Sequence, residues 1–325
     1  MQRKTCKLLS TILAVALCST AFTACNQDNS VTFSPFWHER AEAPQDGTIE
    51  KLTYDVSFEK SSGLNFNYSV DYKDGVYTTT LTRFDDNGTK RYRYETSLEI
   101  TVIYECDGTT SAPFTDSVTS WVEFETAETG LKPLKMHKET KSHSPVSTEV
   151  TNVEESYVYY ETTTDIDYVS GTATVVTVWP DFTENETNTR TSTVKKEDKY
   201  THLDNEQLLV AVRGISPENN SSPSFSVYSP YTDAAQIIQA SFGSKKARKV
   251  ANLTINGMKI EKEISYYPVT LSLNAQNSGM SQTLHVAAKI PSGANTYRNV
   301  VLSYEAPLSL NLGTLTYSLT NAEFM

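Results

Sequence analysis

Residues 52–59 read LTYDVSFE, and residues 64–72 read LNFNYSVDY. In both stretches an apolar or aromatic side chain occupies every second position. Successive side chains of a β-strand point to opposite faces, so this alternation predicts strands with one apolar and one polar face. The stretches 76–84 (VYTTTLTRF) and 91–105 (RYRYETSLEITVIYE) continue the pattern. This part of the chain therefore predicts an antiparallel sheet with one face in water.

Two dipeptides mark the expected turns between these strands. Asp74-Gly75 precedes the third stretch, and Asn87-Gly88 follows it. Asp-Gly and Asn-Gly pairs supply the positive φ angles that two-residue hairpin turns need, so both pairs are predicted as hairpins. A further Asn-Gly pair at 256–257 predicts another hairpin later in the chain.

The rest of the chain is also predicted to be mostly strands. The predicted strands are 117–126, 132–140, 156–164, 172–179, 284–290, 300–308 and 312–324. The stretch 180–199 is rich in Thr, Asn, Glu and Lys, and is predicted as an exposed loop or a hairpin tip. Residues 233–242 (DAAQIIQASF) fit either a short helix or a strand.

One segment carries a clear helix signal. Asp204 can cap a helix, and Gln207 stands at the position that completes a capping box. The apolar run LLVAVR at 208–213 follows, and Gly214 then provides a stop. Because this short helix is apolar on most sides, we expect it to be buried against the sheet.

Three segments resemble a group of bacterial envelope proteins called domain of unknown function 3108. They are 130–134 (GLKPL), the helix at 204–213 and the closing stretch 304–319 (YEAPLSLNLGTLTYSL). The resemblance covers most of 49–325 and implies a shape similar to periplasmic lipoprotein carriers, without implying an activity. The predicted fold is therefore mainly β: an antiparallel curved sheet or half-open barrel with one short buried helix.

The first 24 residues have the order of a secretory signal. Arg3, Lys4 and Lys7 precede an apolar stretch at 8–17 (LLSTILAVAL), and small residues follow it. The apolar stretch is about ten residues long, whereas a membrane-spanning helix needs about twenty. A removable signal peptide at 1–24 is therefore favoured over a permanent transmembrane helix.

The end of this leader, FTAC at 22–25, resembles the lipobox of bacterial lipoprotein precursors. In that family a diacylglyceryl group is attached to the cysteine, here Cys25, which becomes the new N-terminus. Ala24 fits the pattern, whereas Phe22 replaces the usual Leu. The resemblance implies acyl chains such as palmitate on Cys25, which hold the protein stably on a membrane when two or more are present. The alternative is an ordinary secretory signal that is cut near Ala21 or Ala24.

The remaining chain divides into a tether and a domain. Residues 25–48 are polar and turn-rich, so they are predicted as the lipidated cysteine with a flexible tether. Residues 49–325 are predicted as a single β-rich domain outside the cytoplasm, in the bacterial cell envelope. Without the leader the chain has 25 basic against 39 acidic residues, a formal charge of −14. This charge argues against nucleic acid and against electrostatic binding to anionic lipid.

The four cysteines predict no intramolecular disulfide. Cys6 and Cys18 lie in the leader, and Cys25 is assigned to lipid. Only Cys106 remains, and it is predicted as a half-buried residue at a strand end. An exported domain without disulfides must be held together by its hydrophobic core.

The sequence carries no known catalytic motif. It has no G-x-S-x-G elbow, no H-E-x-x-H, and no P-loop or Rossmann glycine pattern. His137 and His143 share one face of a predicted strand, but no Cys or third His lies nearby to complete a zinc site. They are interpreted as solvated strand residues, and neither a metal nor another cofactor is predicted.

Two other groups of side chains are candidates for a functional site. Four acidic residues could act as paired carboxylates in glycoside hydrolysis, although a solvated acidic face is the favoured interpretation: Glu154, Glu155, Asp165 and Asp167. Six aromatic residues could line a sugar- or lipid-binding surface, although half-buried strand positions are favoured: Tyr92, Tyr94, Tyr157, Tyr159, Tyr160 and Trp179.

Three hypotheses of function remain. The first is a non-catalytic lipoprotein, anchored through Cys25, that binds an apolar ligand or a partner protein of the envelope. The second is an envelope hydrolase that acts on glycans. The third is a scaffold or assembly lipoprotein that uses an unpaired strand edge. The first needs an apolar cavity, the second a cleft with two acids, and the third an exposed edge.

Overall fold

The structure is a computed structural model of the full chain. It describes residues 46–62, 66–127, 130–180, 186–215, 222–273, 281–292, 295–297 and 299–325. The predicted signal peptide, Cys25 and most of the predicted tether lie outside these residues. The first strand begins at Gly47, inside the last part of the predicted tether. Within the described ranges, no helix has the length and apolar character needed to cross a membrane.

Strands make up most of the described chain, and its helices are short. The strands are β1 (Gly47–Lys60), β2 (Tyr68–Asp86), β3 (Thr89–Cys106), β4 (Thr109–Thr110), β5 (Phe114–Ala127), β6 (Gly130–Pro145), β7 (Tyr157–Asp167), β8 (Thr172–Trp179), β9 (Glu186–Thr193), β10 (Thr201–Leu203), β11 (Ser224–Ser229), β12 (Ala234–Phe242), β13 (Lys246–Arg248), β14 (Thr254–Ile255), β15 (Met258–Lys259), β16 (Ile264–Leu273), β17 (Ser281–Ser292), β18 (Asn295–Tyr297), β19 (Val301–Pro307) and β20 (Gly313–Phe324). The helices are α1 (Leu208–Ala211) and the 3-10 helices η2 (Val153–Glu155), η3 (Asn205–Gln207), η4 (Val212–Gly214) and η6 (Ser309–Asn311).

The main strands form one large, mostly antiparallel sheet. Hydrogen-bonded neighbours follow the order β9, β8, β7, β6, β5, β3, β2, β1, β20, β19, β17, β16, β12, β11, β10. The pair β10–β11 is parallel. The first and last strands therefore pair in the centre of the sheet, and its two ends come from the middle of the chain.

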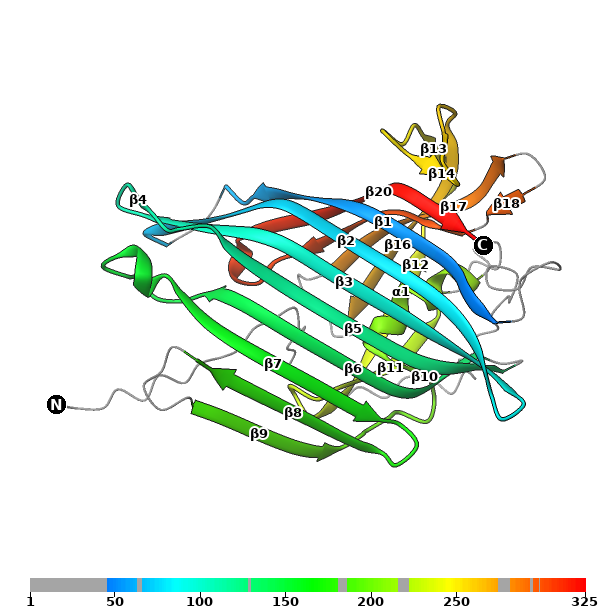
Figure 1. The fold of residues 1–325 in the computed structure, drawn as a ribbon, viewed down its shortest axis with the longest axis horizontal. Helices are drawn as coiled ribbons and strands as arrows, with labels where there is room; N and C mark the ends of the chain where they lie inside the picture. Colours follow the sequence, from blue (N-terminus) through cyan, green and yellow to red (C-terminus); the bar gives the residue numbers. More distant parts are fainter. Residues whose placement is uncertain are drawn as a thin grey trace.

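The sheet curves so that its two ends approach each other. In Figure 1, β1 to β9 form a broad twisted wall, β11, β12, β16 and β20 lie behind it, and α1 lies between them. Side chains join β9 to the hairpin of β11 and β12: Ser192 Oγ lies 2.6 Å from Tyr228 OH, and Arg190 donates to the Tyr231 carbonyl at 3.0 Å. The fold is a curved antiparallel sheet, or half-open barrel, with one short buried helix, which confirms the predicted class.

The inward face of the sheet follows the alternation seen in the sequence. On β1, Leu52, Tyr54 and Val56 are buried, as predicted for the apolar face. The phenol rings are an important part of this core: Tyr304 and Tyr317 stack with their centroids 3.9 Å apart. The Tyr54 hydroxyl donates to the Val301 carbonyl at 2.9 Å, so its polar end is satisfied inside the barrel.

The prediction of a hairpin at Asp74-Gly75 is wrong. Strand β2 runs through this dipeptide, and the register against β3 shifts between Lys73 and Val76, as in a β-bulge. Asp74 has the positive φ angle of 51° that suggested a turn. Gly75 is required for another reason: a Cβ atom there would lie 2.7 Å from Val56 Cβ on β1.

The other turn predictions have mixed outcomes. Asn87-Gly88 joins β2 to β3 with φ angles of 54° and 85°, which confirms that hairpin. The Asn-Gly pair at 256–257 joins the two short strands β14 and β15. Residues 233–242 form mainly a strand, β12, rather than a helix. Within the stretch 180–199, the described strand β9 pairs with β8 as one arm of a hairpin.

Candidate ligand-binding cavity

The helical segment η3–α1–η4 lies inside the half-open barrel, where η3 contacts β5 and β11. Its start is held by the predicted capping box: the Asp204 side chain accepts from the backbone of the first turn, and Gln207 Oε1 accepts from the Asp204 N–H at 2.9 Å. Leu208, Val210 and Val212 are buried. The prediction of a capped, buried helix is confirmed, although only its central turn is α-helical.

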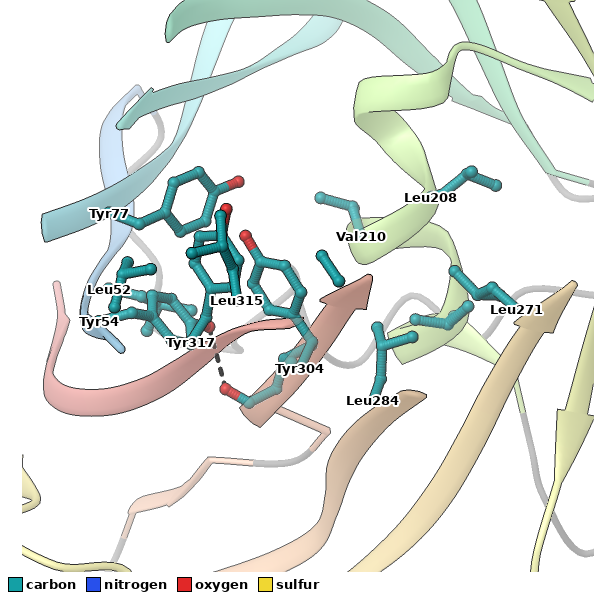
Figure 2. Packing of buried hydrophobic residues seen from close by; sticks show 14 of the residues in the cluster. Leu52, Tyr54, Tyr77, Leu208, Val210, Leu271, Leu284, Tyr304, Leu315 and Tyr317 are labelled. Carbon is teal, nitrogen blue, oxygen red and sulfur yellow. Dashed lines mark hydrogen bonds between the residues drawn. The ribbon is translucent and has the colours of Figure 1, made fainter. Parts of the chain in front are cut away.

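A cavity of about 300 Å³ lies between this helical segment and the sheet. Much of its wall is apolar and aromatic, and includes Tyr77, Leu98, Ile100, Leu208, Tyr304, Leu315 and Tyr317. Figure 2 shows the rings of Tyr77, Tyr304 and Tyr317 opposite Leu208 and Val210 of α1. Burial raises the pKa of Tyr77 and of Tyr304, so these phenols are neutral at physiological pH.

One end of the barrel supplies part of the cavity wall. Ser144 and Pro145 at the end of β6, Pro307 at the end of β19 and Ser309 in η6 belong to its wall. All four are half-buried. We call this end the mouth of the cavity.

The opposite wall of the cavity is polar and comes mainly from β5 and β6. Asp116, Lys138, Thr140 and Ser142 face the cavity there. Asp116 Oδ2 accepts from Ser142 Oγ at 3.0 Å, and Asp116 Oδ1 lies 2.8 Å from Nδ1 of His143. The same carboxylate also accepts from the His143 backbone N–H at 2.9 Å. Its negative charge is therefore held by three donors at the edge of the cavity.

A second cavity of about 110 Å³ lies on the other side of η3. It is bordered by Met136, Ile166, Val227, Ile238 and Leu271 among others. The two cavities share the wall formed by five residues: Lys138, Asn205, Glu206, Leu208 and Gln282. The first helical turn thus separates two apolar spaces within one interior.

A half-buried ion pair lies in this shared wall. Lys138 Nζ lies 2.9 Å from Glu206 Oε1, and Ser120 Oγ donates to Glu206 Oε2 at 3.0 Å. Burial lowers the pKa of Lys138, but the Glu206 carboxylate more than offsets this effect, and the pKa is raised. Burial raises the pKa of Glu206, but Lys138 more than offsets it, and the pKa is lowered. Both groups are therefore charged, and each neutralises the other.

Asp204 lies next to this pair and is fully buried. Burial and then the charge of Glu206 raise the pKa of Asp204 to about 6. The Tyr168 hydroxyl donates to Asp204 Oδ2, and the Glu206 N–H donates to Oδ1 at 2.7 Å. The carboxyl group that caps the helix therefore titrates closer to neutral pH than an ordinary Asp.

The two histidines weighed as metal ligands bind different carboxylates. His137 Nδ1 lies 2.7 Å from Asp165 Oδ1 on the outer face of the sheet, and His143 contacts Asp116. Burial lowers the pKa of His137, but Asp165 more than offsets it, and the pKa is raised. In the part of the chain that the structure describes, no three His, Cys, Asp or Glu residues are grouped as a metal site.

The four acidic residues weighed for glycan hydrolysis do not line either cavity. Glu154 and Glu155 lie in η2 before β7, whereas Asp165 and Asp167 lie at the other end of that strand. At each end a carboxylate holds the local backbone. Glu155 accepts from the Thr151 N–H at 2.9 Å, and Asp167 accepts from the N–H groups of Val169 and Ser170. The hydrolase hypothesis stays a prediction from sequence.

The aromatic residues that could line a binding surface differ in burial and do not form one surface. Tyr92, Tyr94 and Tyr160 are buried, and of these Tyr160 borders the larger cavity. Tyr157 and Tyr159 are half-buried, and their ring centroids lie 5.6 and 4.7 Å from that of His143. The structure places Cys106 at the end of β3, as predicted, but buries it fully.

Lys138, Thr140 and Glu206 are the site residues that sequence reasoning missed. Lys138 and Thr140 belong to the lysine-rich run KMHKETKSH at 135–143, a composition typical of an exposed strand. The alternation of β6 turns Lys138, Thr140 and Ser142 inward, and the capped helix brings Glu206 to meet Lys138. The alternate spacing of Lys138, Thr140 and Ser142 could have indicated a common face. Glu206, the partner of Lys138, lies far along the chain, so no local sequence pattern indicated that contact.

Comparisons with known proteins identify no family for this chain. No protein-family model matches it, and no curated protein matches it. The chain is similar to the crystal structure of a beta-barrel-like protein of domain of unknown function DUF1849 from Brucella abortus, with a TM-score of 0.45 and 10% sequence identity. That similarity covers 86% of this chain and 98% of the other chain. The resemblance to domain of unknown function 3108 stays a prediction.

Proposed function

We propose that this protein is a membrane-anchored lipoprotein of the bacterial cell envelope whose β domain binds an apolar ligand inside the half-open barrel. The observation that carries the ligand part is the cavity of about 300 Å³ between the helical segment and the sheet. Small-molecule sites are concave and mostly apolar, with a few polar groups that orient the ligand. The anchor part is supported by the leader at 1–24 and the lipobox-like sequence that ends at Cys25.

The empty space inside an otherwise packed core also supports this proposal. Protein interiors are normally close-packed, and an empty space of this kind costs stability because its lining atoms lack partners. Here the space is bounded by fully buried rings such as Tyr304 and Tyr317, and it opens at the mouth. A ligand with an apolar chain would restore these contacts and remove its own apolar surface from water.

The test is a fluorescence titration with N-phenyl-1-naphthylamine, a neutral apolar probe that brightens in apolar sites. The purified protein should bind it saturably. Val118 is half-buried on the cavity wall, so Val118→Phe should fill part of the space and weaken binding at least about tenfold, the effect of losing ~1.4 kcal/mol.

The matched control is the same substitution at Val76, which is 45% exposed and does not border the cavity. Val76→Phe should leave the affinity for the probe unchanged. Equal affinities of the probe for the wild-type protein and for Val118→Phe, with both proteins folded by circular dichroism, would contradict the proposed site.

A further inference from the structure

The polar wall of the cavity indicates the chemistry of the ligand's polar end. We propose that the cavity takes an amphiphile with an apolar chain and an uncharged hydrogen-bonding group, such as a hydroxyl, ester or amide, and that Thr140 binds this group. The inference rests on the proposed function, because it names the substrate class of the same cavity. It excludes carboxylate, phosphate and ammonium head groups.

Thr140 has a hydroxyl group that is ready for a ligand. Thr140 is 2% exposed and belongs to the cavity wall. Its Oγ1 has no hydrogen-bond partner among the described residues. Buried hydroxyls are normally paired, because an unpaired one has lost its water without a replacement. Its cross-strand neighbour Thr162 follows this rule, with Oγ1 3.2 Å from Thr177 Oγ1. Thr140 therefore has an unused donor and acceptor at the cavity.

The charged inward-facing residues of the same wall already have partners. Lys138 is bound to Glu206, whose second oxygen accepts from Ser120. Asp116 is held by Ser142 and His143. The inward-facing wall thus has two carboxylates and one engaged ammonium group, so an anionic head group would be repelled and would find no free cation.

Lys141 borders the cavity but does not change this balance. It is exposed, and it alternates along β6 with the inward-facing residues Thr140 and Ser142. Successive side chains of a strand point to opposite faces, so the Lys141 ammonium group stays in solvent.

A cationic head group is also disfavoured. The carboxylates of Asp116 and Glu206 already accept hydrogen bonds on both oxygens, and Lys138 would repel a second cation. Burying an unpaired charge costs far more than burying a neutral group that forms one hydrogen bond. The geometry therefore favours an uncharged group at Thr140.

The experiment compares three amphiphiles with the same chain: 1-decanol, decanoate and decylammonium. Each displaces N-phenyl-1-naphthylamine from the purified protein at neutral pH. We expect 1-decanol to bind at least about tenfold more tightly than either ion, since an unpaired buried charge costs more than ~1.4 kcal/mol. Thr140→Val keeps the shape of the side chain and should weaken 1-decanol binding about three- to tenfold, as expected for one hydrogen bond.

Thr162→Val is the matched control, because it makes the same change on the neighbouring strand outside the cavity wall. It should leave the affinity for 1-decanol unchanged, and both variants should bind the naphthylamine probe like the wild-type protein. Binding of decanoate or decylammonium as tight as that of 1-decanol would overturn the inference, as would an unchanged affinity of Thr140→Val for 1-decanol. Absence of probe binding by the wild-type protein would instead reject the proposed function.

Discussion

The ion pair between Arg213 and Glu50 fixes the end of the helical segment to the sheet. Arg213 NH1 and NH2 donate to the two carboxylate oxygens of Glu50, each at 2.6 Å, and both side chains are 2% exposed. Arg213 Nε also donates to the Asn299 carbonyl at 2.9 Å. Burial lowers the pKa of Arg213, but Glu50 more than offsets it, and the pKa is raised. A single residue thus connects η4 to β1 and to the residues before β19.

Removing one partner of this pair should destabilise the protein strongly. Arg213→Met leaves the Glu50 carboxylate buried without its cation, which should lower the free energy of unfolding by about 3–5 kcal/mol. Combining it with Glu50→Leu removes the second charge as well, so the double variant should recover part of this loss. Urea unfolding followed by circular dichroism measures both effects. A loss below about 1 kcal/mol for Arg213→Met alone would show that the pair has little structural role.

At the scale of the elements, the helical segment forms one side of both cavities. Its length is short for a helix, so its stability depends on its cap and on its burial rather than on helix propensity. Asp204 supplies that cap, and its raised pKa of about 6 lies above the ordinary value of 3.8. The folded protein therefore binds a proton at Asp204 more tightly than the unfolded chain does.

This cap should make stability depend on pH. Because the folded pKa of Asp204 is the higher one, the free energy of unfolding should fall as pH rises from about 4 to about 6. Asp204→Asn keeps a capping oxygen without the titration, so this fall should be absent from the variant. The measurement is the difference in unfolding free energy between the wild-type protein and the variant at several pH values.

Asp167 offers a control with the opposite sign. Hydrogen bonds from backbone N–H groups, chiefly from Ser170, lower the pKa of Asp167. The stability that Asp167 contributes should therefore be lost as pH falls through its folded pKa, and Asp167→Asn should remove this effect. The same pH slope for Asp204→Asn and for the wild-type protein would contradict the role of the cap.

The turns show what local sequence can and cannot determine. Asn87-Gly88 forms the predicted hairpin because the turn itself requires both positive φ angles. Asp74-Gly75 has the same local signal, but its glycine is required by the close approach of Val56 on β1, a contact distant in sequence. A dipeptide alone does not distinguish a hairpin from a bulge in a continuous strand.

For the helix and the cavity too, the local features could be predicted from the sequence, whereas contacts between distant residues could not. The capping box at Asp204 and Gln207 and the apolar run after it were sufficient to predict a buried helix, since these signals are local. Residues 233–242 were ambiguous, and pairing of β12 with β11 and β16 decides for a strand. The ion pair of Lys138 with Glu206 depends on the register of β6 and on the position of the helix, which the sequence does not state.

At the scale of the whole molecule, strand β1 spans the distance from the start of the described chain to the mouth of the cavity. The strand begins at Gly47, beside the last strand, where Glu50 pairs with Phe324. It ends at Lys60, which pairs with Gly313, just after the η6 turn at the mouth. At about 3.3 Å per residue, this strand separates the two by roughly 45 Å.

The anchor itself is tested at Cys25. We expect Cys25→Ser to abolish labelling by a palmitate analogue and to release the protein from the membrane fraction, because the thiol proposed to carry the lipid is removed. The variant should still bind N-phenyl-1-naphthylamine like the wild-type protein. Unchanged labelling and membrane retention would reject Cys25 as the lipid site, whereas absence of labelling from the wild-type protein would favour an ordinary secretory signal.

Methyl NMR of the protein with 1-decanol tests where the apolar chain binds. Leu98, Leu208 and Leu315 come from β3, α1 and β20, and all three border the larger cavity. We expect intermolecular NOEs from the decanol chain to the methyl groups of all three residues, and none to the exposed Val76. NOEs confined to exposed methyl groups such as those of Val76 and Met258, with the three cavity leucines unaffected, would contradict binding inside the barrel.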